Sequence, residues 1–388
     1  MKVKMMAAIA CGLLSVSPAI AADKIKIGFV NTFTGASGIL GKHYRDAFDL
    51  AVSDLGQKFG GLPVEVIYGD DQLKPDIAKS VVEKMIERDR VDIVAGFNFT
   101  NVLLSSIDVG IGAGKIVLSS NAGPATLAGE KCSPQFFSVG HQNDGAAEAM
   151  GQYLRQKNVE NVLVITPNYQ AGREMVDGFK RGYKAPLVGE IATSITQNDY
   201  SAELSQIRAK NPSAVFAFMP GGAAITFIKQ WSQAGLKDKI PLYSVYTVDN
   251  VTLPAIGDAA IGVLGSSQWV EDLPGEQNQK FVQAFYKKYR YMPSEYAANA
   301  YDTALLIDSA VRLVNGKIED RAAFLEAFSK ADFKSNRGNL RFNTNNFVIQ
   351  DYHLREVVRG PSGELGFKTK ETIVKDYKDA YAEKCKMK

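Results

Sequence analysis

Two short polar loops carry the residues best suited to hold a small anion. The segment 97–100 follows an apolar run and opens a helical stretch, and the segment 119–123 ends the next apolar run. Backbone N–H groups at the start of a helix, with hydroxyl and amide side chains beside them, favour a carboxylate. A plain helix cap at Thr100 is compatible with the same role. The candidate carboxylate-binding residues are Asn98, Phe99, Thr100, Asn121, Ala122 and Gly123.

Two glycine-rich segments resemble nucleotide-binding motifs but lack what those motifs need. In the segment 35–43, a phosphate-binding loop would need glycine at position 36 and Ser or Thr at position 43, where the chain has Ala36 and His43. The segment 110–114 comes before a strand, whereas the glycines of a dinucleotide site follow one. We interpret the first segment as a strand-to-helix loop at the rim of a cleft and the second as a helix end.

The sequence offers no motif for covalent or metal catalysis. It holds no Gly-x-Ser-x-Gly elbow, no His-Glu-x-x-His and no Cys-x-x-Cys, and His43, His141 and His353 lie far apart without metal-ligand spacing. We therefore expect that the protein is not an enzyme and that it needs no metal and no cofactor.

Alternating strands and helices have to position the polar loops. Apolar β-rich runs are expected to form strands at 25–30, 64–68, 91–95, 115–118, 161–165, 214–218 and 241–245. Helical periodicity lies between them at 44–55, 76–88, from 101, 146–156 and 172–183. This alternation predicts parallel sheets, and its restart after about residue 140 predicts an α/β fold of two lobes.

The two lobes are expected to share the chain unequally. Lobe 1 is predicted to comprise residues 22–140 and 271–345, and lobe 2 residues 141–270 and 346–388. The chain would pass between the lobes near 139–142, near 268–272 and near 342–350, and several crossings make a hinge. Ligands of open α/β sheets bind beyond the carboxyl ends of the strands, so the polar loops would face a cleft that can close.

The first residues have the three-part pattern of a secretory signal peptide. Lys2 and Lys4 precede an apolar stretch, and small residues end at Ala21. The stretch is shorter than a membrane span. We expect residues 1–21 to be removed on export to the periplasm, which lowers the formal charge from +3 to +1. A near-neutral chain gives no reason to expect nucleic acid or an anionic membrane as a partner, and we take a monomer as the starting expectation.

Two cysteines remain after the predicted cleavage, Cys132 and Cys385. An even pair in an oxidising compartment is compatible with one disulfide. Two unpaired thiols far apart remain the alternative, because the sequence does not give their distance.

A series of short segments keeps an order and spacing that carry a resemblance. They are the segments 26–35, 120–124, 127–132, 167–172, 178–180, 256–262, 296–298, 300–302, 333–338 and 342–345. Together they resemble the leucine/isoleucine/valine-binding type of periplasmic receptor over essentially the whole mature chain. The resemblance implies a type I periplasmic-binding fold, a ligand closed between two lobes, and delivery to an ABC permease with its ATPase. It also implies that the ligand carboxylate lies on the loops that hold Thr100 and Ala122.

The second lobe departs from the amino-acid-binding members of that family. Those members are expected to hold the ligand ammonium with a tyrosine and an acid, whereas the matching loops here contain Met219 and Tyr246 and no carboxylate nearer than Asp249. A buried ammonium without a counter-charge would cost several kcal/mol. Aromatic residues stand at or near the strand ends instead, namely Phe33, Phe97, Phe99, Tyr169, Tyr246 and Trp269.

Aromatic walls with one carboxylate anchor predict an aromatic acid such as a hydroxybenzoate or hydroxycinnamate. Some of these rings are expected to serve only core or hinge packing. Three alternatives stay open: a receptor for branched-chain or other amino acids, a sensory ligand-binding protein, and an amide-sensing or enzymatic derivative of the same fold. The predicted ligand-binding residues are Phe33, Asn98, Phe99, Thr100, Asn121, Ala122, Gly123, Tyr169, Met219, Tyr246 and Trp269.

Overall fold

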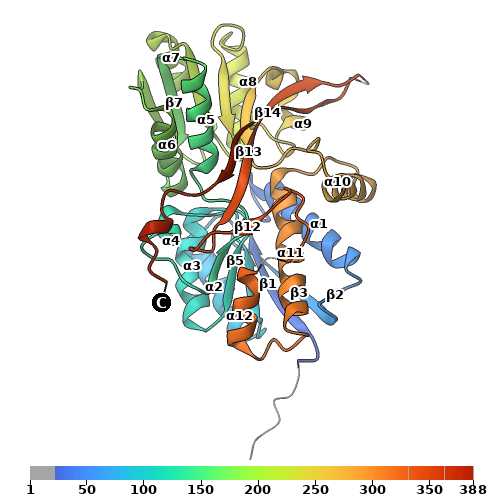
Figure 1. The fold of residues 1–388 in the computed structure, drawn as a ribbon. Coiled ribbons are helices and arrows are strands. Elements are labelled where there is room, and N and C mark those ends of the chain that lie inside the picture. The colour runs from blue at the N-terminus through green and yellow to red at the C-terminus, as the bar shows by residue number, and fades with distance from the viewer. Residues whose placement is uncertain (1–21, 331, 362, 388) are drawn as a thin grey trace, which may run out of the picture.

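The computed structural model describes residues 22–330, 332–361 and 363–387, and the expected signal peptide, residues 1–21, lies outside the described residues. The described chain forms two α/β lobes stacked one above the other (Figure 1). Within the described ranges, no helix is long and apolar enough to cross a membrane.

The first lobe is built on a six-stranded sheet with the order β2-β3-β1-β4-β5-β6. Its strands are β1 (Ile25–Asn31), β2 (Lys58–Phe59), β3 (Leu62–Asp70), β4 (Ile93–Gly96), β5 (Ile116–Ser119) and β6 (Phe136–Ser138). All neighbours are parallel except β2 and β3. The helices between these strands are α1 (Gly38–Asp54), α2 (Pro75–Glu87), α3 (Thr100–Gly112) and α4 (Ala125–Ala128). Apolar residues dominate β1, β4 and β5, as expected for a parallel sheet covered on both faces.

The second lobe is built on an eight-stranded sheet. Its strands are β7 (Val162–Pro167), β8 (Gly189–Thr193), β9 (Ala214–Phe218), β10 (Leu242–Val245), β11 (Leu264–Ser267), β12 (Arg341–Phe342), β13 (Val348–Arg359) and β14 (Leu365–Tyr377). Its helices are α5 (Gly145–Gln156), α6 (Gln170–Tyr183), α7 (Ser201–Lys210), α8 (Gly222–Gln233) and α9 (Leu253–Ile256), followed by the 3-10 turn η1 (Gly257–Ala260). Strands β7 to β11 are parallel to one another, whereas β13 is antiparallel to β11 and β14.

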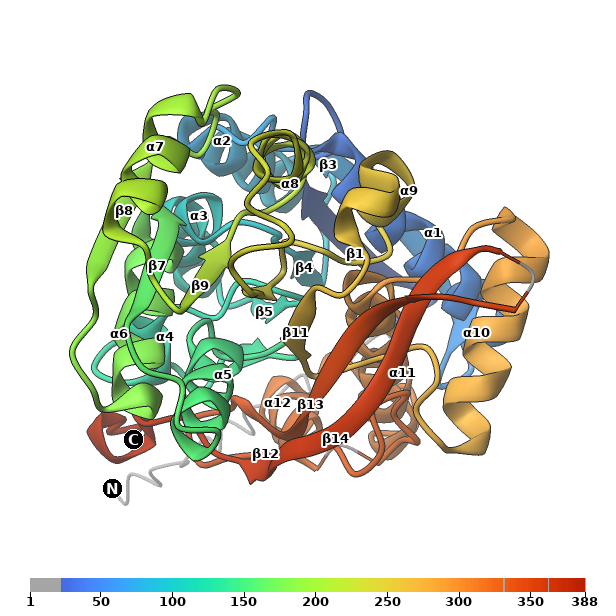
Figure 2. The same ribbon diagram turned by 90° about the horizontal axis from the view of Figure 1, so that it is seen from above.

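The chain crosses between the two sheets more than once. After β11 it returns to the first lobe as α10 (Glu276–Tyr289), α11 (Glu295–Leu313) and α12 (Arg321–Ser329), and then enters β12 and β13 of the second sheet. In Figure 2, β13 and β14 run as a twisted ribbon between α5 and α10. The mixed α/β architecture with two mostly parallel sheets confirms the predicted fold class.

The buried side chain of Arg337 forms hydrogen bonds to two of the crossings. The guanidinium of Arg337 donates hydrogen bonds to the carbonyl oxygens of Val139 and Gly140 in the first crossing, at 2.7 and 2.8 Å. It also donates to the side chains of Asp302 on α11, at 2.8 Å, and Gln350 on β13, at 2.7 Å. Because both members of the Arg337–Asp302 ion pair are fully buried, losing either one would leave an uncompensated charge.

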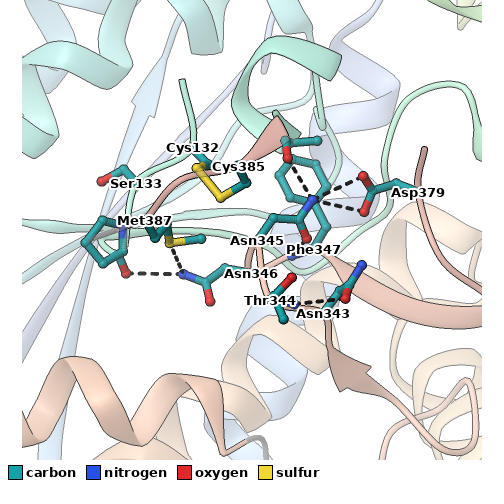
Figure 3. The surroundings of a disulfide bond; sticks show 12 residues. Cys132, Ser133, Asn343, Thr344, Asn345, Asn346, Phe347, Asp379, Cys385 and Met387 are labelled. Carbon is teal, nitrogen blue, oxygen red and sulfur yellow. Dashed lines mark hydrogen bonds between the residues drawn. A yellow bond between two sulfur atoms is a disulfide. The ribbon is translucent and has the colours of Figure 1, made fainter. Parts of the chain in front are cut away.

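A disulfide joins Cys132 to Cys385 and holds the end of the chain against the first lobe. After β14 the chain turns back toward α4, where the carboxamide of Asn345 donates to both carboxylate oxygens of Asp379 (Figure 3). The 3-10 turn η2 (Ala382–Lys384) precedes the bridge. The last residues of the chain are therefore covalently attached to the loop that follows α4.

Two features of the fold differ from the sequence-based expectation. The helix expected from residue 44 begins at Gly38, so most of the glycine-rich segment 35–43 is helical. A Cβ atom at Gly41 would lie 2.1 Å from the carbonyl oxygen of Thr32, which means that glycine lets the first turn of α1 pack against the loop after β1. The long β13–β14 ribbon is not predicted by the sequence analysis, because charged and polar residues interrupt both strands and leave no continuous apolar run.

Candidate ligand-binding site

The candidate site is a small cavity between the strand ends of the two sheets. Strand β1 lies between β3 and β4, and β7 lies between β8 and β9, so each sheet reverses its strand order at the loops that face the cavity. The cavity has a volume of about 20 Å³, which is room for about one water molecule. It is lined by Asn98, Phe99, Thr100, Asn121, His141, Asn143, Tyr169, Ala171, Met175, Phe218, Pro220, Tyr246 and Tyr296.

One wall of the cavity is the start of α3. Gly96 has φ 110° and Phe97 has φ 63°, and this left-handed pair turns the chain sharply after β4. A positive φ is unusual for an aromatic residue, and such positions cluster at functional sites. The turn directs Asn98, Phe99 and Thr100 at the cavity and begins α3 at Thr100. The first amides of the helix, which no carbonyl of a preceding turn can reach, therefore lie beside the cavity.

Asn98 adds an unused donor to the same wall. Its Oδ1 accepts from the hydroxyl of Tyr44 at 3.4 Å and from the carboxamide of Asn121 at 3.3 Å, which fixes the orientation of the amide. Its Nδ2 and the Oδ1 of Asn121 are buried and have no hydrogen-bond partner among the described residues. Buried polar atoms without partners are uncommon in native proteins, and a ligand that binds here could satisfy them.

The side chain of Asn143 is hydrogen-bonded to the hydroxyl of Thr100. Its Oδ1 accepts from the backbone N–H of Gly123 at 2.8 Å, so its Nδ2 must face the other way. That nitrogen donates to Thr100 Oγ1 at 3.0 Å and to Glu174 Oε2 at 2.6 Å. Burial raises the pKa of Glu174 to about 7, although the hydrogen bonds that its carboxyl accepts act in the opposite direction.

The other walls are aromatic. The imidazole of His141 stacks on the ring of Tyr246 with 4.9 Å between centroids, and Tyr246 lies 6.2 Å from Tyr296. Tyr169 and Phe218 form a second near-parallel pair with 6.3 Å between centroids. The rings come from both lobes and from the first crossing, so the shape of the cavity depends on how the lobes are placed.

The cavity has no charged lining residue among the described side chains, since neither Asp, Glu, Lys nor Arg contributes to it. Burial lowers the pKa of His141 to about 3, with a smaller effect from Arg337, so the imidazole is neutral near pH 7. An anion would therefore be held by neutral donors and the helix start, in the way that helix N-termini bind anions. A ligand ammonium would meet no carboxylate on the walls.

Two buried acids, Glu295 at the start of α11 and Asp249 after β10, serve other partners. Glu295 forms a buried ion pair with Arg355 at 2.8 Å. Oδ1 of Asp249 accepts from the backbone N–H groups of Val251 and Thr252, at 2.8 and 2.9 Å. Its Oδ2 is buried without a partner in the described chain, and burial followed by the charge of Glu295 raises the pKa of Asp249 to about 7. Neither acid lines the cavity.

The structure brings six of the residues predicted from the sequence to the cavity, namely Asn98, Phe99, Thr100, Asn121, Tyr169 and Tyr246. Ala122 and Gly123 lie just behind it. Their backbone N–H groups donate to the carbonyl of Phe97 at 3.1 Å and to Asn143 Oδ1 at 2.8 Å, so neither amide is free for a carboxylate in this conformation.

Three further predicted residues lie away from the cavity. Phe33 packs edge-on against Tyr68, and its backbone N–H donates to the carboxylate of Asp70 on β3. Met219, the residue after β9, is fully buried, with its sulfur 3.9 Å from the hydroxyls of Thr193 and Tyr200.

Trp269 is also fully buried and does not line the cavity. Its indole N–H donates to Asn278 Oδ1 at 2.7 Å, and its ring contacts Phe281. It packs the second crossing against α10, which is the structural role that the sequence left open for some of the aromatic residues.

Sequence reasoning missed seven lining residues: His141, Asn143, Ala171, Met175, Phe218, Pro220 and Tyr296. Phe218 is predictable from the sequence, because it is the last residue of β9. Its position resembles that of Tyr169, which comes shortly after β7. His141 lies in the predicted first crossing, but nothing in its sequence spacing predicts contact with a ligand.

A second, more open part of the cleft lies outside the inner cavity. It has a volume of about 380 Å³, and Pro220 belongs to both. The loop at Gly35–Ser37 forms one side of it, and Pro220 and Gly222 with the segment 195–198 form the other. The glycine-rich segment thus lies at the rim of the cleft, where the sequence placed it.

Comparisons with known proteins agree with the fold. The model of the periplasmic binding protein family matches residues 24–363, and the chain belongs to this family. A Leu/Ile/Val-binding protein homolog from Brucella melitensis is 26% identical over 365 residues, which are 91% of this chain and 93% of the relative.

Two solved structures are similar over nearly the whole chain. An ABC transporter solute-binding protein from R. palustris in complex with benzoate superposes with a TM-score of 0.88 at 27% identity, covering 94% of this chain and 99% of that one. A solute-binding protein from Rhodopseudomonas palustris BisB5 in complex with 3,4-dihydroxybenzoic acid gives a TM-score of 0.86 at 25% identity, covering 92% and 99%. The protein is thus an ABC transporter solute-binding protein of the type I periplasmic-binding class, and the predicted family is confirmed.

Proposed function

We propose that this protein captures a small aromatic carboxylate, of the benzoate or hydroxybenzoate kind, in the periplasm and presents it to the permease and ATPase of an importer. The observation that carries the proposal is the lining of the inner cavity. Six ring-bearing side chains surround it, namely Phe99, His141, Tyr169, Phe218, Tyr246 and Tyr296. The other lining side chains are uncharged: Asn98, Thr100, Asn121 and Asn143 are polar, and Ala171, Met175 and Pro220 are apolar.

The two ends of such a ligand would contact different parts of the cavity. The carboxylate would accept hydrogen bonds from Thr100, from the unpaired Nδ2 of Asn98 and from the first amides of α3. The ring would lie among the aromatic side chains, where offset and edge-on contacts are favourable. Tyr169 and Tyr296 both line the cavity, so their hydroxyl groups would offer hydrogen-bond partners to a ring hydroxyl of the ligand.

The volume of the cavity supports a mechanism of opening and closing. Room for one water molecule is far too little for an aromatic ring, so the walls must move apart before the ligand enters. Since the walls come from both lobes, the simplest motion is rotation about the crossings that Arg337 holds together. The ligand would then stabilise the closed arrangement by contacts with both lobes.

A receptor for a branched-chain amino acid is the second candidate, because the Brucella relative bears a Leu/Ile/Val-binding name. It requires a counter-charge for the ammonium, and Asp249 with its unpaired Oδ2 is the acid that could supply it after rearrangement. The absence of any acid from the described lining weighs against this candidate.

A thermal-shift screen distinguishes the two candidates. Ligands that bind the native state raise the melting temperature by mass action. Benzoate, 4-hydroxybenzoate and 3,4-dihydroxybenzoate should stabilise the chain, and leucine, isoleucine and valine should not. Stabilisation by the amino acids alone would refute the proposed ligand class.

A further inference from the structure

A buried carboxyl of the second lobe reaches the carboxylate wall of the first. Glu174 lies on α6 and is almost fully buried. Its Oε1 accepts from the backbone N–H of Ala125, at the start of α4, at 3.1 Å, and from Gln170 at 2.7 Å. Its Oε2 accepts from Asn143 at 2.6 Å. Glu174 is thus hydrogen-bonded to its own helix, to the first crossing and to the first lobe at once.

These bonds determine how Thr100 can use its hydroxyl. The Nδ2 group of Asn143 has two hydrogens, and one goes to Glu174 while the other goes to Thr100 Oγ1. Thr100 Oγ1 therefore accepts on the protein side. Its own hydrogen has no acceptor among the described residues, and Thr100 lines the cavity. The hydroxyl hydrogen of Thr100 can therefore be donated to a ligand in the cavity.

Resting on the proposed function, we infer that Glu174 and Asn143 are positioning residues for the ligand carboxylate. Glu174 fixes Asn143, and Asn143 fixes the hydroxyl of Thr100 as a donor toward the ligand. Because Glu174 belongs to the second lobe and Ala125 to the first, these bonds form together only when the lobes are close at this point. The arrangement thus couples closure of the cleft to the preparation of the anion site.

The inference predicts that substitutions at Glu174 act through Thr100. In Glu174→Gln the side chain keeps its shape, but a single amide oxygen cannot accept from Ala125 on one side and Asn143 on the other. Benzoate affinity, measured by calorimetry, should fall about 3- to 10-fold, the size expected for one misoriented hydrogen bond. Glu174→Asp, which keeps the charge and draws the carboxyl back by one methylene, should have a similar effect.

A double-mutant cycle separates positioning from a general structural role. In a Thr100→Val background there is no hydroxyl to orient, so adding Glu174→Gln should weaken benzoate binding no further. Additive losses in the double variant, or an unchanged affinity in both single Glu174 variants, would overturn the inference.

Glu148→Gln is the matched control. Glu148 is a partly buried carboxylate on the neighbouring helix α5, where it accepts from Arg181 and Tyr377 and has no contact with the cavity. This variant should leave benzoate affinity unchanged. A loss as large as that of Glu174→Gln would show that any buried carboxylate near α6 matters equally, which contradicts the inference.

The test also separates this inference from the proposed ligand class. The positioning acts on a carboxylate whatever its apolar end, so the cycle is run with benzoate and with leucine in parallel. Binding of leucine without benzoate would refute the aromatic ligand, and a non-additive cycle with leucine would still support the roles of Glu174 and Asn143. Additivity with the carboxylate that binds would refute those roles alone.

Discussion

The imidazole of His141 and the ring of Tyr246 lie nearly parallel, with 4.9 Å between centroids and an angle of 17°. His141 belongs to the first crossing, and Tyr246 follows β10 of the second lobe in a left-handed conformation with φ 50°. This stack joins the aromatic wall of the cavity to the connection about which the lobes would rotate. The position of the ring wall therefore depends on the same segment that Arg337 holds.

The buried histidines make stability depend on pH in the acid range. Burial lowers the pKa of His43 to about 3, and the unfolded value is about 6.5. The stability linked to His43 is complete above pH 6.5 and is lost as the pH falls toward 3. Between pH 7.5 and 5, the free energy of unfolding of His43→Phe should decrease by about 2 kcal/mol less than that of the wild-type protein, as measured by urea unfolding. Parallel curves for the two proteins would contradict a buried neutral His43.

Thr100→Val tests the anchor of the carboxylate. The variant keeps the shape of the side chain but removes the hydroxyl that faces the cavity. Benzoate affinity should fall about 10- to 100-fold, the loss expected for one hydrogen bond to a charged group. The melting temperature of the ligand-free protein should change little, because only Asn143 donates to that oxygen. An unaltered dissociation constant would exclude Thr100 from the site.

Gly222→Leu tests whether closure is needed for binding. A Cβ atom at Gly222, at the start of α8, would lie 3.2 Å from the Cβ of Ala36 in the other lobe. A larger side chain should hold the rims apart, weaken benzoate binding at least about tenfold and enlarge the radius of gyration in X-ray scattering. Gly112→Leu is the control, because nothing lies near a Cβ atom at Gly112. Equal affinity in the two variants would argue against closure.

Removal of the disulfide should destabilise the protein. The bridge between Cys132 and Cys385 closes a loop with a sequence separation of 253 residues. In the Cys132→Ser/Cys385→Ser variant the free energy of unfolding should decrease by about 2–5 kcal/mol, as measured by urea unfolding. A reduced wild-type protein should behave like the variant. Identical unfolding curves with and without the bridge would contradict this expectation.

The sequence predicts residues that line the cavity where the signal is local. Asn98 to Thr100 were found because a buried strand, a polar turn and a helix start follow one another within ten residues. The same reasoning predicts Tyr169, two residues after the end of β7, and Tyr246, the residue that follows β10. Strand ends of parallel sheets gather at one edge, so such residues meet without any knowledge of long-range contacts.

The sequence could not give what depends on distant contacts. Trp269 and Phe218 both stand near strand ends, but only packing against Asn278 and Phe281 turns Trp269 away from the cavity. Asn143 lies in a crossing without regular structure, and its role arises from Thr100 and Glu174, which are 43 and 31 residues away. No periodic pattern records such a contact.

The most direct test of the proposed function is calorimetric titration of the purified protein with benzoate and, separately, with leucine. The aromatic lining without acids predicts saturable binding of benzoate at one site per chain and no measurable heat with leucine. Saturable binding of leucine with none of benzoate would contradict the account and would direct attention to Asp249 as the partner of a ligand ammonium.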